Sequence, residues 1–166
     1  GAQSYTGTTS STFNGTYLSA GGVFGVTGAA LLGGATSIDT TNAGGTAAGA
    51  NITFRSTINN GQTLSLTGGT AGAITLSGIV GGSSTLTSFT ANANTISTIG
   101  VNTNASQSYT GATSTTFNGN YNVSTSSNSF TVTGAALLAG ATSINSGTSS
   151  TLSFSSTINN AQTLSL

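Results

Sequence analysis

Hydrophobic and polar residues alternate along most of this chain. TLSL at 63–66 places two leucines on one side and two hydroxyls on the other, and FTVT at 130–133 repeats the arrangement. A period of two is typical of a β-strand with one buried face. Turn-forming pairs such as Asn60-Gly61 and Gly81-Gly82 separate these runs. Because no segment has the apolar spacing of an amphipathic helix, the pattern predicts an all-β chain of short strands.

The apolar positions recur at a nearly constant spacing of about 22. This spacing aligns Ile52 with Ile74, Phe54 with Leu76, Ile58 with Val80, Leu64 with Leu86, Ile74 with Ile96 and Ile79 with Val101, and a further step of 21 leads to Phe117. From Phe117 to Phe154 the spacing lengthens to 37, and from Phe13 to Ile52 it is 39. Both long intervals contain a GAALL block. We therefore expect rungs of about 22 residues with occasional rungs of about 37, which is within the range of periods found in repeat proteins.

Short strands at a fixed spacing predict a parallel β-solenoid. Each rung adds one strand to each of several sheets and rises by about 4.8 Å. A rung cannot bury its own apolar edge, so each rung shelters its neighbours. We expect six or seven rungs whose inward side chains form a core ladder. The predicted members of this ladder are Ile52, Phe54, Leu64, Ile74, Leu76, Leu86, Ile96, Phe117, Phe130, Val132, Leu152, Phe154 and Leu164.

A longer repeat overlies the short one. QSYTGTTSSTFNGTY at 3–17 returns at 107–121 with 12 of 15 positions identical, and TGAALLGGATSI and STINNGQTLSL also return later in the chain. Internal repetition is the signature of stacked units. We therefore interpret residues 1–166 as one solenoid segment within a longer array. It comprises a first copy at 3–66, intervening rungs at 67–106 and a second copy at 107–166.

The repeated blocks resemble the low-complexity repeats of large bacterial exoproteins of the filamentous haemagglutinin type. The resemblance is carried by QSYTGATSTTFNG, by ITLSGIVGGSSTLTSFTANANTISTIG and by QTLSLTGG, and it covers essentially the whole chain. It implies a right-handed parallel β-helix, secretion across the outer membrane, and a place at the cell surface as an adhesin shaft or fibre. The poverty of charge departs from that pattern and leaves a self-packing filament or sheath open.

Composition narrows the possible functions. Ser, Thr, Asn and Gly supply 102 of the 166 residues, and Asp39 and Arg55 are the only ionised side chains. With no His or Cys and one carboxylate, we expect no catalytic residues, no metal site and no cofactor. One arginine cannot neutralise a phosphate backbone, so we expect no nucleic-acid partner. No apolar run reaches membrane-spanning length, so we expect no membrane insertion.

Several polar and aromatic features allow two interpretations. Asp39 and Arg55 are interpreted as incidental surface residues, because Asn145 and Ser155 replace them in the second copy. The recurring aromatics fit an internal ladder better than a carbohydrate-stacking face. Sequons and Thr-x-Thr or Thr-x-Ser pairs could carry glycans or form a hydroxyl array. The sequons begin at Asn14, Asn51, Asn104 and Asn122, and the pairs are Thr63/Ser65, Thr85/Thr87, Thr131/Thr133 and Thr163/Ser165.

The favoured function is that of a non-catalytic structural repeat in a secreted surface protein, forming an extended shaft or fibre. Its partners would be other copies, flanking repeats of the same chain, or surface glycans, and its location the bacterial cell surface or the extracellular space. A self-assembling extracellular filament or sheath subunit is one alternative. The other is an ice- or glycan-binding module that uses an exposed face of Thr, Asn and Tyr.

Overall fold

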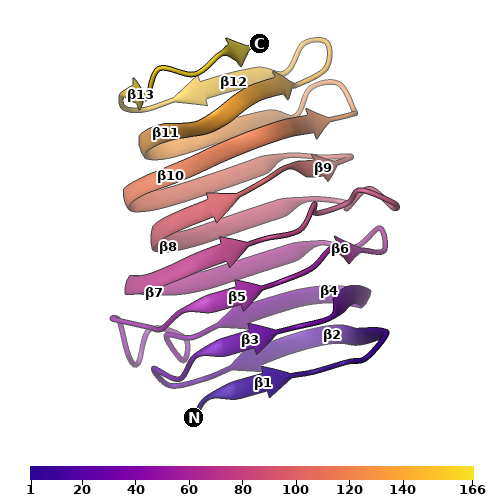
Figure 1. The fold of residues 1–166 in the computed structure, drawn as a ribbon, viewed down its shortest axis with the longest axis vertical. Helices are drawn as coiled ribbons and strands as arrows, with labels where there is room; N and C mark the ends of the chain where they lie inside the picture. Colours follow the sequence, from indigo (N-terminus) through magenta and orange to yellow (C-terminus); the bar gives the residue numbers. More distant parts are fainter.

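The computed structural model describes residues 1–166 and contains strands, turns and loops but no helix. Its strands stack along the long axis, with the two termini at opposite ends (Figure 1). The nearer strands run left to right and the fainter, more distant strands run right to left as the chain climbs, so the coil is right-handed. All strand pairs are parallel, and the predicted parallel β-solenoid is confirmed.

Fourteen strands belong to one continuous sheet that is wound into the coil. They are β1 (Gln3–Tyr5), β2 (Ser10–Leu18), β3 (Phe24–Val26), β4 (Ala29–Asp39), β5 (Ile52–Phe54), β6 (Ile58–Asn59), β7 (Leu64–Leu76), β8 (Phe89–Thr98), β9 (Val101–Thr103), β10 (Gln107–Val123), β11 (Ser129–Asn145), β12 (Thr151–Phe154), β13 (Ile158–Asn159) and β14 (Leu164–Ser165). The longest strands turn a corner of the coil, with a register shift at the bend.

The pairing divides each coil into three faces. Face 1 begins at Gln3 and continues through the residues that pair above it, which are Phe24, Ile52, Ile74, Ile96, Thr115, Ala136 and Ile158. Face 2 runs through Ser11, Ala30, Ile58, Val80, Val101, Tyr121 and Ile144. Face 3 runs through Tyr17, Ile38, Leu66, Ala91, Tyr109, Val132 and Phe154. From Gln3 to Ile158 the chain makes seven turns.

Alternation within each strand sends one set of side chains into the coil. In β5, Ile52 and Phe54 are buried and Thr53 between them is partly exposed; in β10, Tyr109 and Phe117 are buried. The inward side chains of all three faces form a single cluster of 29 buried residues. Burial of apolar surface contributes about 25 cal/mol per Å². This cluster is therefore the main source of stability, and it depends on stacking rather than on any single coil.

Glycines at one kind of corner allow neighbouring coils to come close. A Cβ atom on Gly28 would collide with the carbonyl oxygen of Gly7, and one on Gly134 would collide with that of Gly111. Gly134 also has a φ of +93°, which L side chains rarely adopt. Because the two glycine pairs occupy matching places in the two copies of the long repeat, the close approach is part of the repeated design.

The predicted long rungs, with a spacing of about 37, are wrong. Phe117 pairs directly with Leu138 in the next coil, so the GAALL block is an ordinary part of a short coil. The longest step on face 1 joins Phe24 to Ile52. The extra length is a loop at residues 40–50, whose base is closed by Thr40: its hydroxyl accepts from the amide of Ala50 and donates to the Ala50 carbonyl, each at 2.9 Å.

Three predicted alignments are also wrong in register. Leu64 pairs with Phe89 rather than with Leu86, which instead bridges to Thr103. Val80 rather than Ile79 lies opposite Val101, and Ile79 is 44% exposed. Ile96 meets Thr115 rather than Phe117. In each case a turn differs in length from the turn in the coil below. The strand after that turn therefore pairs at a position other than the one that a constant spacing of about 22 residues predicts.

The two copies of the long repeat lie on different faces. Gln3 lies on face 1, whereas its counterpart Gln107 pairs with Phe89 on face 3. From Gln3 to Ile96 the chain makes four turns, and Gln107 lies two faces further on. Vertical neighbours are nevertheless kept: Tyr5 pairs with Val26, and Tyr109 pairs with Val132. The repeat therefore preserves the vertical neighbours of each residue, and not the face of the coil on which that residue lies.

Candidate functional site

The predicted ladder residues line the interior of the coil. Those from Ile52 to Val132 are all buried, whereas the last three lie in the final coil and are partly buried. These three are Leu152, Phe154 and Leu164. The aromatic rings line the interior too. Tyr109 packs edge-on against Phe117 with ring centroids 5.1 Å apart, and Tyr5 packs edge-on against Phe13 at the same distance. The rings therefore pack as an internal ladder, with Tyr109 and Phe117 fully buried and Tyr5 partly buried in the first coil.

A buried polar network crosses the core of the second copy. The side-chain amide of Gln107 donates to the carbonyl oxygens of Val101 at 2.9 Å and Asn122 at 3.0 Å, and to the hydroxyl of Thr103 at 3.2 Å. Its oxygen accepts from the Tyr109 hydroxyl at 2.8 Å. Sequence alternation alone did not indicate this network, because Gln107 occupies an inward position that usually holds an apolar residue.

Burial controls the ionisation of the two inner tyrosines. It raises the pKa of Tyr109 well above the ordinary value, with the nearby Tyr121 adding to the effect. Burial raises the pKa of Tyr121 to about 12, although hydrogen bonds to Thr98, Asn118 and Gly100 oppose it. Both hydroxyls are therefore neutral at physiological pH and act as structural hydrogen-bonding groups rather than as acids or bases.

The outer surface of face 3 carries a vertical column of hydroxyls. One outward position holds Ser or Thr in seven successive coils, and the members pair directly with one another: Thr16, Ser37, Ser65, Thr90, Ser108, Thr131 and Ser153. The Thr-x-Thr and Thr-x-Ser pairs of the sequence do not all lie on this face. Thr63/Ser65 and Thr131/Thr133 lie on it, whereas Ser165 pairs with Ser143 on face 2. The sequon asparagines Asn14, Asn51 and Asn104 are exposed, and Asn122 is partly exposed.

The two ionised side chains have different roles. Asp39 accepts hydrogen bonds from the amide and hydroxyl of Thr41 at 2.7 and 2.6 Å, and from the amide of Ala43 at 2.9 Å. Burial acts to raise the pKa of Asp39, but these hydrogen bonds outweigh it and hold the pKa below its ordinary value. Asp39 thus shapes the start of the 40–50 loop, and its carboxylate is occupied within its own turn.

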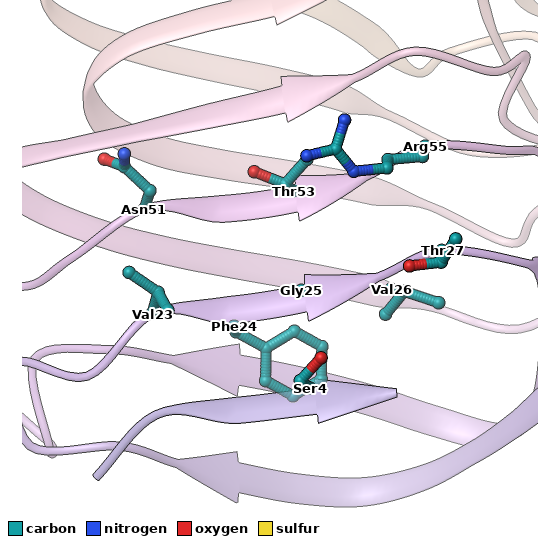
Figure 2. A pocket seen from close by; sticks show the side chains of 9 residues that line it. All are labelled: Ser4, Val23, Phe24, Gly25, Val26, Thr27, Asn51, Thr53 and Arg55. Carbon is teal, nitrogen blue, oxygen red and sulfur yellow. The ribbon is translucent and has the colours of Figure 1, made fainter. Parts of the chain in front are cut away.

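Arg55 lies beside a hollow of about 340 Å³ on the outside of face 1, across β1, β3 and β5. Figure 2 shows Gly25 in the middle of this hollow and the Arg55 side chain folded back toward Thr53. The remaining lining is half polar and half apolar and comes from Ser4, Thr27 and Asn51 and from Val23, Phe24 and Val26. The sequence predicts an incidental Arg55 because Ser155 replaces it in the second copy, and nothing in the linear order connects Arg55 with Gly25, which lies one coil earlier in the chain.

The site chemistry is limited to hydrogen bonding and one positive charge. No group of three or more His, Cys, Asp or Glu side chains comes together in the fold. No helix is long and apolar enough to cross a membrane. The hollow holds a guanidinium, an amide and several hydroxyls, which can bind a polar ligand but provide no nucleophile with a base beside it. We therefore treat the hollow as a candidate binding site.

Comparison with known proteins finds no match: no family model, no curated protein and no solved structure is significantly similar to the chain. The resemblance to filamentous haemagglutinin-type repeats stays a prediction, and the fold and the candidate site rest on the residues of this chain.

Proposed function

We propose that this chain is a structural segment of a secreted surface protein, in which it forms part of an extended, non-catalytic shaft of the adhesin type. The observation that supports this proposal is the unbroken vertical ladder. On each face, inward residues pair directly from one coil to the next from the first coil to the last. A shaft needs length and stiffness, and the ladder supplies both along one axis.

The geometry accounts for the stiffness. Because each coil adds about 4.8 Å, seven turns give a rod segment of roughly 34 Å. Backbone hydrogen bonds between parallel strands run along the rod axis, so bending the rod strains many of them together. The side chains reinforce this: Ser88 donates to Thr63 and Ser129 donates to Ser106, each hydroxyl pair at 3.3 Å and each bridging two coils.

Stretching the 166-residue chain between its ends tests the mechanical part of the proposal. A shaft held together coil by coil should unravel in repeated steps, each releasing about 22 residues, or roughly 70 Å of extended chain at about 3.3 Å per residue. The matched control is pulling across the rod between two engineered attachment points on one coil, which should unfold it at a different force. A single all-or-none release along the axis would contradict coil-by-coil stacking as the source of strength.

Surface labelling tests the location. Antibodies raised against the folded chain should label intact cells that produce it, and an external protease should remove the signal. Labelling that requires permeabilised cells would overturn the proposed surface role while leaving the fold untouched. The control is an antibody against a cytoplasmic protein of the same cells, which should label only after permeabilisation.

A self-packing filament or sheath is the second candidate, and the lack of charge favours it. The chain carries one positive and one negative side chain among 166 residues, so charge repulsion does little to keep copies apart. Sedimentation and electron microscopy separate the two candidates. Rods that remain single over a wide concentration range support the shaft, whereas laterally aligned bundles that form without an added partner support the sheath.

A further inference from the structure

Several residues that line the hollow beside Arg55 differ between the two copies of the long repeat. Its counterpart in the second copy is built on the same vertical neighbours, since Gly25 pairs with Thr53 and Thr131 pairs with Ser153. Yet four lining positions change side-chain chemistry: Val23 is replaced by Ser129, Gly25 by Thr131, Asn51 by Thr151 and Arg55 by Ser155. No second hollow occurs in the structure. The two copies therefore differ together in the residues that line this hollow.

Gly25 has no structural requirement to be glycine. A Cβ atom built on it would meet nothing within 4 Å, and its φ lies outside the left-handed region. Glycine inside a strand is less favourable than alanine, because it gains no packing and loses more backbone freedom on folding. The outward positions above it carry Thr53, Thr75 and Ser97. The effect of Gly25 is to leave an opening in this column of hydroxyls.

The polar groups around the opening include hydrogen-bond donors that are available to a ligand. The side-chain oxygen of Asn51 accepts from the amide of Ala73 at 2.9 Å, which orients the side chain and leaves its NH₂ group for a ligand. Arg55 is exposed, and no carboxylate lines the hollow. The only carboxylate side chain, Asp39, is held by its own turn. The guanidinium therefore carries the one uncompensated side-chain charge of the molecule.

We propose that this hollow binds a saccharide residue bearing one carboxylate. A guanidinium matches a carboxylate through two parallel N–H···O bonds. The Asn51 amide and the hydroxyls of Ser4 and Thr53 offer donors and acceptors for ring hydroxyls, and Val23, 50% exposed, offers an apolar edge for a ring face. About 340 Å³ is at the small end of ligand sites and suits one sugar ring rather than a larger ligand. This binding role goes beyond the shaft function and does not depend on it.

Nuclear magnetic resonance titration of the full chain with glucuronate tests the proposal. The chain has a single arginine, so its side-chain Nε–H signal reports on this site alone. We expect saturable shifts of that signal and of the backbone amides of Gly25 and Thr53, with a dissociation constant on the order of 1 mM. Glucose, which lacks the carboxylate, should leave them in place. An absence of saturable shifts with both glucuronate and a glucuronate oligomer would overturn the proposal.

The second copy supplies matched variants. Gly25→Thr and Arg55→Ser install residues that the same scaffold already tolerates, and each should weaken binding at least about tenfold while amide signals elsewhere stay in place. The double variant R55S/S155R keeps the composition and charge but moves the arginine to the filled copy, so it should not bind. If that variant bound glucuronate equally well, the position of the arginine would not matter. If the wild type bound inorganic phosphate as tightly as glucuronate, the arginine would bind anions in general. Either result would refute the saccharide assignment.

A glucuronate oligomer distinguishes the source of the ligand. Tighter binding of the oligomer than of the monosaccharide would place the recognised residue within a polymer, and equal binding would indicate that one ring fills the site. Both outcomes support the proposal. Because none of the substitutions touches the core cluster, the shaft function can fail its own tests while this site passes, and the reverse also holds.

Discussion

Replacing Gln107 with alanine should destabilise the chain far more than the same change at Gln3. The two residues are counterparts in the long repeat and make similar bonds. Gln107 is fully buried, and Gln3 lies half-buried in the first coil. Gln3 donates to the Leu18 carbonyl at 2.9 Å and accepts from Tyr5 at 3.0 Å. The comparison separates the effect of burial from the effect of residue type.

The magnitude follows from the bonds that would be lost. The two hydrogens on the Gln107 side-chain nitrogen are shared among three acceptors, and its oxygen accepts one bond from Tyr109. This arrangement amounts to three bonds, each contributing about 1 kcal/mol, and water cannot easily reach the groups left behind. We therefore expect Gln107→Ala to lower the free energy of unfolding by about 3 kcal/mol. For Gln3→Ala we expect a loss below about 1 kcal/mol, because solvent can replace its bonds.

Urea unfolding followed by far-ultraviolet circular dichroism and by tyrosine fluorescence measures both losses. Tyrosine fluorescence is usable because the chain has no tryptophan. Gln107→Glu is a useful further variant, since it keeps the shape but places an acid in the core. It should be at least as destabilising as Gln107→Ala at neutral pH and recover on acidification. Equal losses for Gln3→Ala and Gln107→Ala would refute the argument that burial makes this network important.

Three further predictions test the interior. Alkaline unfolding should develop between pH 10 and pH 12. The folded-state pKa of Tyr121 is raised to about 12 from an ordinary value of 10.0. The stability that the neutral Tyr121 hydroxyl contributes is therefore complete below pH 10 and lost by about pH 12. Tyrosinate absorbance and circular dichroism should change together, and early absorbance change in an intact fold would contradict this. Thr115→Val should stabilise the chain by about 1 kcal/mol in urea unfolding, because the buried Thr115 hydroxyl has no hydrogen-bond partner; a loss of stability would point to an unrecognised partner. Val80→Ser should cost about 2–3 kcal/mol and Ile79→Ser almost nothing, because Val80 is buried and Ile79 is exposed; the reverse order in thermal melts would restore the register first expected from the sequence.

The sequence predicts which segments form strands and which side chains point into the core, because both depend on local chemistry. Alternation correctly predicts that Ile52 and Phe54 point inward, and the constant short spacing correctly pairs them with Ile74 and Leu76. A strand buried on one face leaves no freedom to shift by a single residue. Turn lengths carry no such constraint. A turn that is longer by a few residues leaves the ladder intact, so equal spacing fails between Leu64 and Phe89.

The candidate site was not predictable, for a related reason. Gly25 and Arg55 become near neighbours only because the chain between Phe24 and Ile52 completes one turn of the coil and brings β5 directly above β3. Comparison of the copies did show that Arg55 is dispensable to the scaffold. On the sequence alone, that observation predicts an incidental surface residue. Because Arg55 lines a hollow, the same dispensability is also compatible with the binding role proposed for that hollow.

The displacement of the two copies from face 1 to face 3 shows what the long repeat preserves. If the repeat served to present one surface in one direction, its copies would lie on the same face, one above the other. Instead, Tyr109 keeps its place beneath Val132 and Ala136 keeps its place beneath Ile158, just as Tyr5 lies beneath Val26 and Ala30 beneath Ile58. Core packing requires only that each side chain meets its vertical neighbours, because dispersion and burial act over contact distances. Repetition of this kind builds length without repeating a binding surface, so a feature such as the hollow at Gly25 can arise in one copy without being imposed on the next.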